Sequence, residues 1–165
     1  TEIYTLHIVG SVDVYKRQGN SPAIVEWGNK LNTKKKILVV DDKGMNRYML
    51  GGIFRDNYEI IEAGGGMEAI AIIDKEYDEL AVILLDIIMP GIDGFGVLEH
   101  MKEQDYLNRV PVVIVTDDSS EATAVKAFEY KVADMVIKPF EPRIIKRRVE
   151  NIIELYAYKE KYGNA

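Results

Sequence analysis

The segment Leu80–Gly94, LAVILLDIIMPGIDG, decides the fold of this chain. Its first six residues are all apolar, Asp86 ends the run, and MPGIDG then supplies turn residues. A short apolar run bounded by turn signals is typical of a strand buried on both faces, as in a parallel sheet. Ile37–Val40, ILVV, is a second such run and ends in Asp41 and Asp42. Both segments therefore indicate parallel strands with carboxylates at their C-terminal ends.

Outward from these strands, apolar runs alternate with segments of helical periodicity. Further strands are predicted at 58–62, 110–115 and 135–137. Helices are predicted at 44–54, 67–73, 93–102, 121–130 and 142–162. The first helix is indicated by the spacing of Met45, Tyr48, Met49 and Ile53, and the last has Pro142 in its first turn, where a missing N–H costs nothing. Five strands alternating with five helices predict a doubly wound α/β fold, a parallel sheet with helices on both faces.

Length, charge and composition exclude several classes of protein. The 165 residues favour one domain with short extensions, and the formal net charge of −6 argues against direct binding of nucleic acid. The chain has no Cys, which excludes disulfides, thiolate metal sites and Cys nucleophiles and is compatible with a reducing compartment. No window approaches the roughly 18 consecutive apolar residues of a transmembrane span, so we expect no contact with a membrane.

The N-terminal residues 1–34 are predicted to lie outside the folded domain. Thr1–Gln18 has no charged region followed by an apolar one, so it is not a signal peptide. Asp13–Gln18, DVYKRQ, is what the transposon end of common sequencing adapters encodes, and we interpret residues 1–18 as translated adapter, the alternative being an ordinary β-rich extension. Gly19–Lys35 has the composition of a linker, and its Trp27 is expected to pack on the domain surface. We predict a domain core at 35–141 and a long C-terminal helix at 142–165.

Polar side chains follow four of the predicted strands. Asp41 and Asp42 end the first strand, Asp86 the third and Thr116 the fourth, while Lys138 follows the fifth. Ligands of open α/β sheets bind at this edge, so these side chains should converge. Three carboxylates crowd together only when a cation shares the site, and oxygen-only ligands indicate Mg²⁺. A carboxylate nucleophile, a divalent cation and the Lys and Thr groups that bind phosphoryl oxygens together predict an aspartyl-phosphate site.

Each of these residues also has a plain structural interpretation. Asp41 and Asp42 are able to form a strand-end turn or a helix cap, Asp86 a turn, and Thr116 a cap, while a lone lysine is usually solvated. Their common placement at strand ends favours the site. A phosphatase of the haloacid-dehalogenase type fits poorly because Lys43 stands where its D-x-D motif has a second aspartate. A flavodoxin-like cofactor binder fits poorly because the acidic loop would repel a phosphate, and no P-loop motif is present.

Over about Lys35–Tyr158 the chain resembles the receiver domain of bacterial response regulators. The motifs ILVVDD, LLDIIMPGIDGF, VIVTDD and VIKPF occur in family order and at the family's usual spacings. The resemblance implies a flavodoxin-like sheet in strand order 2-1-3-4-5. It also implies a cytoplasmic, chemotaxis-regulator-like signalling domain of a two-component system, a phosphoacceptor rather than an enzyme.

The resemblance assigns a role to each strand-end residue. Asp86 would accept a phosphoryl group from the phosphohistidine of a sensor kinase or phosphotransfer protein. Asp42 and Asp86 would hold Mg²⁺ directly, Asp41 would act mainly through water, and the carbonyl of Ile88 would complete the protein ligands. Thr116 would bind one phosphoryl oxygen and shift inward on phosphorylation. Lys138 would bind another oxygen, and the peptide bond before Pro139 would be cis.

Two positions depart from the family pattern. Met135 stands where an aromatic switch residue is usual, and its flexible side chain would couple to Thr116 less sharply. Asp117 stands where a small residue is usual, and we expect it to face solvent and cap the following helix. Neither departure removes a group that the phosphotransfer chemistry needs.

Phosphorylation of Asp86 is expected to switch the face formed by the fourth helix, the fifth strand and the fifth helix. In the family this face binds a partner protein or output domain, or forms a homodimer. Because 142–162 would span about 31 Å at the α-helical rise, we expect it to lead toward an output domain outside this chain. The alternatives are a stand-alone phosphorelay receiver and an interaction module that works without phosphorylation.

Overall fold

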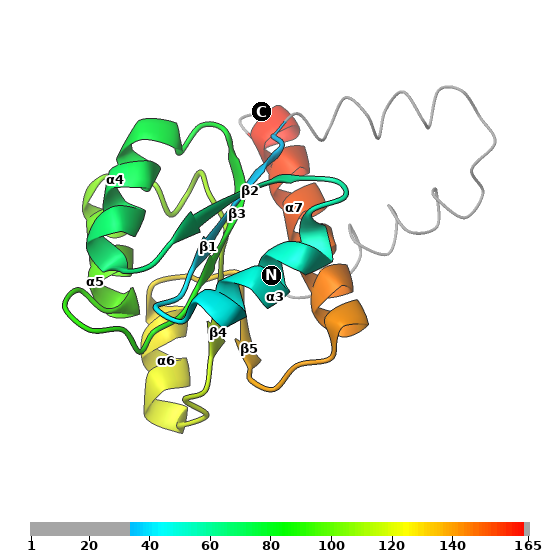
Figure 1. Ribbon diagram of the computed structural model, residues 1–165. Coiled ribbons are helices and arrows are strands. Elements are labelled where there is room, and N and C mark those ends of the chain that lie inside the picture. Colours follow the sequence, from blue (N-terminus) through cyan, green and yellow to red (C-terminus); the bar gives the residue numbers. More distant parts are fainter. Residues whose placement is uncertain (1–33, 164–165) are drawn as a thin grey trace.

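The computed structural model describes residues 34–163, which form five strands and five helices (Figure 1). In chain order the elements are β1 (Lys36–Val40), α3 (Gly44–Phe54), β2 (Glu59–Ala63), α4 (Gly66–Glu76), β3 (Leu80–Leu85), α5 (Gly94–Glu103), β4 (Val112–Thr116), α6 (Glu121–Glu129), β5 (Asp134–Ile137) and α7 (Pro142–Tyr162). The predictions for residues 1–18 and Trp27 lie outside the described residues. The predicted alternation is confirmed, with element ends shifted by at most a few residues.

The strands form one parallel sheet in the order β2-β1-β3-β4-β5, as the family resemblance implied. Leu38 in β1 is opposite Ile61 in β2 and Ile83 in β3. Because all five strands run in the same direction, their C-terminal ends lie along one edge. Loops that leave this edge are therefore brought together from distant parts of the sequence.

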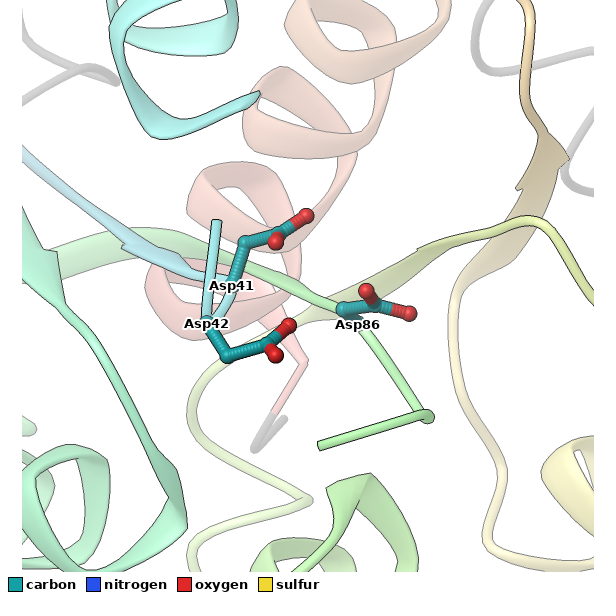
Figure 2. A group of neighbouring side chains, drawn as sticks. All are labelled: Asp41, Asp42 and Asp86. Atoms are coloured by element: carbon teal, nitrogen blue, oxygen red, sulfur yellow. The ribbon is translucent and has the colours of Figure 1, made fainter. Parts of the chain in front are cut away.

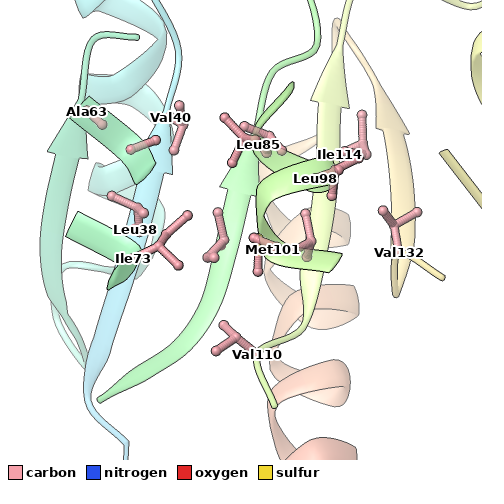
Figure 3. Packing of buried hydrophobic residues seen from close by; sticks show 14 of the residues in the cluster. Leu38, Val40, Ala63, Ile73, Leu85, Leu98, Met101, Val110, Ile114 and Val132 are labelled. Carbon is pink, nitrogen blue, oxygen red and sulfur yellow. The ribbon is translucent and has the colours of Figure 1, made fainter. Parts of the chain in front are cut away.

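The core lies in two layers, one on each face of the sheet. Alternate residues of β1 point to opposite faces, so Leu38 and Val40 belong to one cluster and Ile37 and Val39 to the other. The first cluster packs under α4, α5 and α6 and is drawn in Figure 3. The second packs under α3 and α7. Every residue of β3 is buried, which explains why LAVILL shows no polar alternation.

Helix α3 exposes most of the apolar residues whose spacing predicted it. Met45, Tyr48 and Met49 are exposed, while Leu50 and Phe54 are buried against the sheet. Adjacent helix positions are about 100° apart, so the buried face lies one residue further along the helix than the pattern suggested. The predicted helix is confirmed, and of the four apolar residues that indicated it only Ile53 packs against the core.

The final helix has the predicted bounds, and its first half is part of the core. Glu141 caps it by accepting a hydrogen bond from the backbone N–H of Ile144. Ile145, Val149 and Ile153 follow one stripe and are buried in the second cluster. None of the helices in residues 34–163 combines the length and the apolar character needed to cross a membrane.

The two outer strands differ from the buried central ones. In β2, Glu59 and Glu62 are exposed, and Glu62 pairs with Arg47 of α3. In β5, which has four residues, Asp134 accepts a two-pronged hydrogen bond from Arg148 of α7, with N···O distances of 2.8 and 2.7 Å. Each outer strand therefore carries one carboxylate that is held by a cation of a neighbouring helix.

Candidate phosphorylation and metal site

Three carboxylates meet at the C-terminal edge of the sheet, as predicted. Asp41 and Asp42 leave β1 and Asp86 leaves β3, and one oxygen from each lies within 4.8 Å of the others. Figure 2 shows these side chains gathered where the chain leaves the two strands. Asp41 and Asp86 are only 1% and 5% exposed, whereas Asp42 is open to solvent. The arrangement thus offers oxygen atoms to a cation that enters from solvent.

Lys138 joins the cluster from the end of β5. Its Nζ lies 2.7 Å from Oδ2 of Asp41 and 3.3 Å from Oδ2 of Asp86. The peptide bond between Lys138 and Pro139 is cis, as the resemblance implied. The lysine therefore pairs with two buried carboxylates at once.

Burial dominates the electrostatics of this cluster. It raises the pKa of Asp86, with a further contribution from the charge of Asp41, although Lys138, the Thr116 side chain and the Ile88 N–H act in the opposite direction. Burial alone would lower the pKa of Lys138, but hydrogen bonds and charges from the two aspartates outweigh it and raise this pKa. The charge of Lys138 outweighs that of Asp41, so the pKa of Asp86 stays raised because burial costs the ionised carboxylate its hydration. Added positive charge would stabilise the ionised form.

Thr116 is completely buried at the end of β4, and its side chain reaches Asp86. The next residue, Asp117, is exposed as expected, but the expectation that it caps α6 is wrong. Ser120 is the N-cap, and it accepts a hydrogen bond from the N–H of Thr123. Asp118 supports this turn by accepting a hydrogen bond from the N–H of Ser120. Asp118 lies two residues before Ser120, so its carboxylate is able to accept the Ser120 N–H.

Met135 and Ile88 both lie near the C-terminal edge of the sheet. Met135, in β5, is partly buried and packs against the first core cluster, opposite Ile114 of β4. The N–H of Ile88 donates to Oδ1 of Asp86 at 3.3 Å, while its side chain is 59% exposed. The loop after Asp86 is therefore tied back onto the carboxylate that it follows.

This loop is also held by close contacts with two glycines. A Cβ placed on Gly94 would lie 2.5 Å from the carbonyl oxygen of Asp86. A Cβ on Gly66, the first residue of α4, would lie 2.2 Å from the carbonyl oxygen of Ile92. The glycines let two helices approach the loop more closely than any side chain would permit.

Two residues at the site were missed by the sequence analysis. Asn46 donates from Nδ2 to Oδ2 of Asp41 at 3.0 Å, and Arg47 donates from Nη1 to the carbonyl oxygen of Asp41 at 2.7 Å. Both lie in the first turn of α3, which begins two residues after the acidic pair. Both residues could have been found in the sequence, because a polar side chain in the first turn of a helix that directly follows a strand-end acidic pair lies close to that pair.

The donor set fits a magnesium ion. Three carboxylates supply oxygen ligands only, which Mg²⁺ prefers, and the exposed side of Asp42 leaves room for the waters that Mg²⁺ retains. A parallel α/β sheet with this strand order, this acidic cluster and a lysine at the same edge is the arrangement that the resemblance to receiver domains implied.

Comparison with known proteins gives the family. The model of the response regulator receiver domain matches residues 37–150, so the chain belongs to that family and is the receiver domain of a two-component response regulator. The transcriptional regulatory protein ResD of Bacillus subtilis is 39% identical over 132 residues, which cover 79% of this chain and 52% of ResD. The chain spans about half the length of the curated relatives it matches.

Solved structures agree with the fold. CheY4 of Vibrio cholerae is 26% identical, with a TM-score of 0.66 over 73% of this chain and 99% of CheY4. The CheX–CheY–BeF₃–Mg²⁺ complex of Borrelia burgdorferi contains a chain that is 25% identical, with a TM-score of 0.67 over 72% of this chain and 88% of that one.

Proposed function

We propose that Asp86 is the phosphoacceptor of this receiver domain. The observation that supports this role is the meeting of Asp86 with two further carboxylates and Lys138 at one edge of the sheet. In the reaction an Asp86 carboxylate oxygen attacks the phosphorus of a phosphohistidine. The new P–O bond forms as the P–N bond breaks, and the imidazole leaves with the electron pair and takes up a proton. The donor is a sensor histidine kinase or a phosphotransfer protein.

Asp41, Asp42, Asp86 and the carbonyl of Ile88 would hold Mg²⁺, Asp41 mainly through water. When bound, the ion neutralises charge on the transferring phosphoryl oxygens. The chain's own residues position the reactants. The Ile88 N–H orients the attacking carboxylate of Asp86. Asp41 and Thr116 are buried, so the phosphoryl donor approaches Asp86 from the side of the exposed Asp42.

Lys138 and Thr116 then bind the phosphoryl group. In the unmodified protein Lys138 contacts Asp86 itself, so only a small movement of Nζ is needed to reach an oxygen on the phosphorylated side chain. Thr116 shifts toward the same group from the end of β4. Met135, which pairs with Ile114 two residues before Thr116 in β4, takes up the space that Thr116 leaves. Thr116 and Met135 thus form the switch.

The switched surface is proposed to be the α6–β5–α7 face, which binds a partner protein, an output domain or a second copy of the chain. Exposed apolar side chains of α6 and β5, namely those of Val125, Phe128 and Ile137, support this assignment. ResD is named a transcriptional regulatory protein, and control of transcription by a longer protein is the corresponding proposal for this chain. We propose a cytoplasmic, signalling and non-enzymatic role for residues 35–163.

Incubation of the full chain with acetyl phosphate and Mg²⁺, followed by intact mass measurement, tests this function. We expect the gain of one phosphoryl group, lost in Asp86→Asn and after chelation of Mg²⁺. Asp56→Asn removes an exposed carboxylate just beyond the end of α3 and is the matched control that should retain the gain. A folded wild-type chain that gains nothing would favour an interaction module that works without phosphorylation.

A further inference from the structure

Asp41 is the most completely occupied carboxylate of the site. Its Oδ1 accepts the backbone N–H of Lys43 at 2.8 Å. Its Oδ2 accepts two side-chain donors, Asn46 Nδ2 at 3.0 Å and Lys138 Nζ at 2.7 Å. A carboxylate with 1% exposure needs such donors, because an unpaired buried charge is costly.

The two donors on Oδ2 differ in what else they must do. Lys138 is shared with Asp86, where the distance is 3.3 Å, and under the proposed function it moves to the phosphoryl group. Asn46 has no such second role among its hydrogen bonds in the described residues, and its backbone N–H is fixed to the carbonyl of Lys43 at 3.1 Å. Phosphorylation therefore removes one donor from Asp41 and leaves the other in place.

We propose that Asn46 is a positioning residue that holds Asp41 in the orientation needed for the divalent cation, above all when Lys138 is engaged by the phosphoryl group. This inference rests on the proposed function. An amide suits the task because it donates a hydrogen bond without adding positive charge beside the cation. A second cation at this position would compete with the metal for the same carboxylate.

Isothermal titration of the full, unphosphorylated chain with MgCl₂ tests the inference without any readout of phosphorylation. Asn46→Ala should weaken Mg²⁺ binding by about tenfold, as is typical for the loss of a residue that orients a metal ligand. Asn108→Ala is the matched control. Asn108 also donates from an amide to a carboxylate, at 2.6 Å to Asp105, but lies in the loop before β4, at the opposite edge of the sheet. It should leave Mg²⁺ affinity unchanged.

A second titration in a Lys138→Ala background mimics the departure of the lysine. Here Asn46→Ala should weaken Mg²⁺ binding by a larger factor than in the wild-type background, since Asp41 Oδ2 would lose its remaining side-chain donor. Asn46→Leu, which keeps the bulk and favours the helix, should behave like Asn46→Ala and thereby separates lost hydrogen bonding from lost packing.

Three outcomes would overturn the inference: a folded Asn46→Ala protein with Mg²⁺ affinity within twofold of wild type, an equal effect from Asn108→Ala, or an equal or smaller effect of Asn46→Ala in the Lys138→Ala background. Failure of the proposed function would look different. In that case the wild-type chain would gain no phosphoryl group from acetyl phosphate, whatever the Mg²⁺ affinities of these variants.

Discussion

Substitution of Gly66 by alanine is expected to disturb the phosphorylation loop from outside the site. The added Cβ would lie 2.2 Å from the carbonyl oxygen of Ile92 and 2.7 Å from its Cγ2. Carbon and oxygen approach to about 3.3 Å in weak contacts, so the loop or the helix must retreat by roughly 1 Å. Overpacking of this kind costs about 1–3 kcal/mol. Because Gly66 is the first residue of α4, the gain for alanine over glycine in a helix interior does not apply in full, and we expect a loss of about 1–3 kcal/mol in the free energy of unfolding.

The same displacement should slow phosphorylation. The loop that carries Ile92 begins at Asp86, and a misplacement of about 1 Å at a reacting group is able to reduce a rate by about 10²-fold. Urea unfolding measures the stability, and the rate of mass gain with acetyl phosphate and Mg²⁺ measures the reaction. Gly52→Ala is the matched control, because Gly52 has no atom within 4 Å of its added Cβ and lies on the exposed side of α3. It should stabilise the protein by about 0.5–1 kcal/mol and leave the rate unchanged.

If Gly66→Ala matches wild type in both stability and rate, the loop is not held by α4. A loss of stability with no change in rate would mean that the loop adjusts without moving Asp86.

Three further changes have definite expected outcomes. Asp86→Asn should stabilise the Mg²⁺-free protein at pH 7. Because the pKa of Asp86 is raised in the folded state, the protonated carboxyl favours folding below the ordinary pKa of 3.8, and this stabilisation is lost as the pH rises through the folded pKa. The neutral amide of Asn does not ionise and so avoids this loss. Urea unfolding at pH 7 and near pH 3 should show this gain disappearing in acid, and a gain that grows in acid would contradict the assignment. Asp93→Ala removes the side chain that accepts the Gly96 N–H and caps α5, and should lower the free energy of unfolding by about 1 kcal/mol; an unchanged urea midpoint would show that the cap contributes nothing. Arg148→Ala breaks the ion pair with Asp134, but because the Arg148 side chain is 43% exposed the loss should be about 1 kcal/mol or less by thermal unfolding. A loss well above that would show that the guanidinium stem supports the packing of α7 on β5.

Most of the site could be predicted because parallel strands carry their C-terminal ends to one edge. Once Leu80–Leu85 and Ile37–Val40 are assigned as buried strands, the positions of Asp41, Asp42 and Asp86 follow with little freedom. The contact of Lys138 with Asp41 and Asp86 was predictable for the same reason, because β5 ends at that edge as well.

The unpredicted parts all depend on how a helix is rotated or where a turn closes. Helix α3 has large apolar residues on both its outer and its inner face, so hydrophobic periodicity predicts the helix without fixing which face is buried. Asn46 was missed for the same reason, because its contact with Asp41 depends on how α3 is rotated about its own axis. Between Asp117 and Asp118, residue type gives no preference for which one supports the cap of α6, and only the geometry of the turn decides it.

The outer strands of the sheet also bear on how this protein avoids aggregation. An unpaired strand edge is a template for strands of other chains, and short, charged edges weaken that template. Here β2 carries the exposed Glu59 and Glu62, and β5 has four residues and the carboxylate of Asp134. A second copy that added its strand to the β2 edge in a symmetric pair would bring like charges together, and the short β5 offers few positions for pairing. The two edges of the sheet are therefore poor templates for strand addition, which disfavours polymerisation through the sheet.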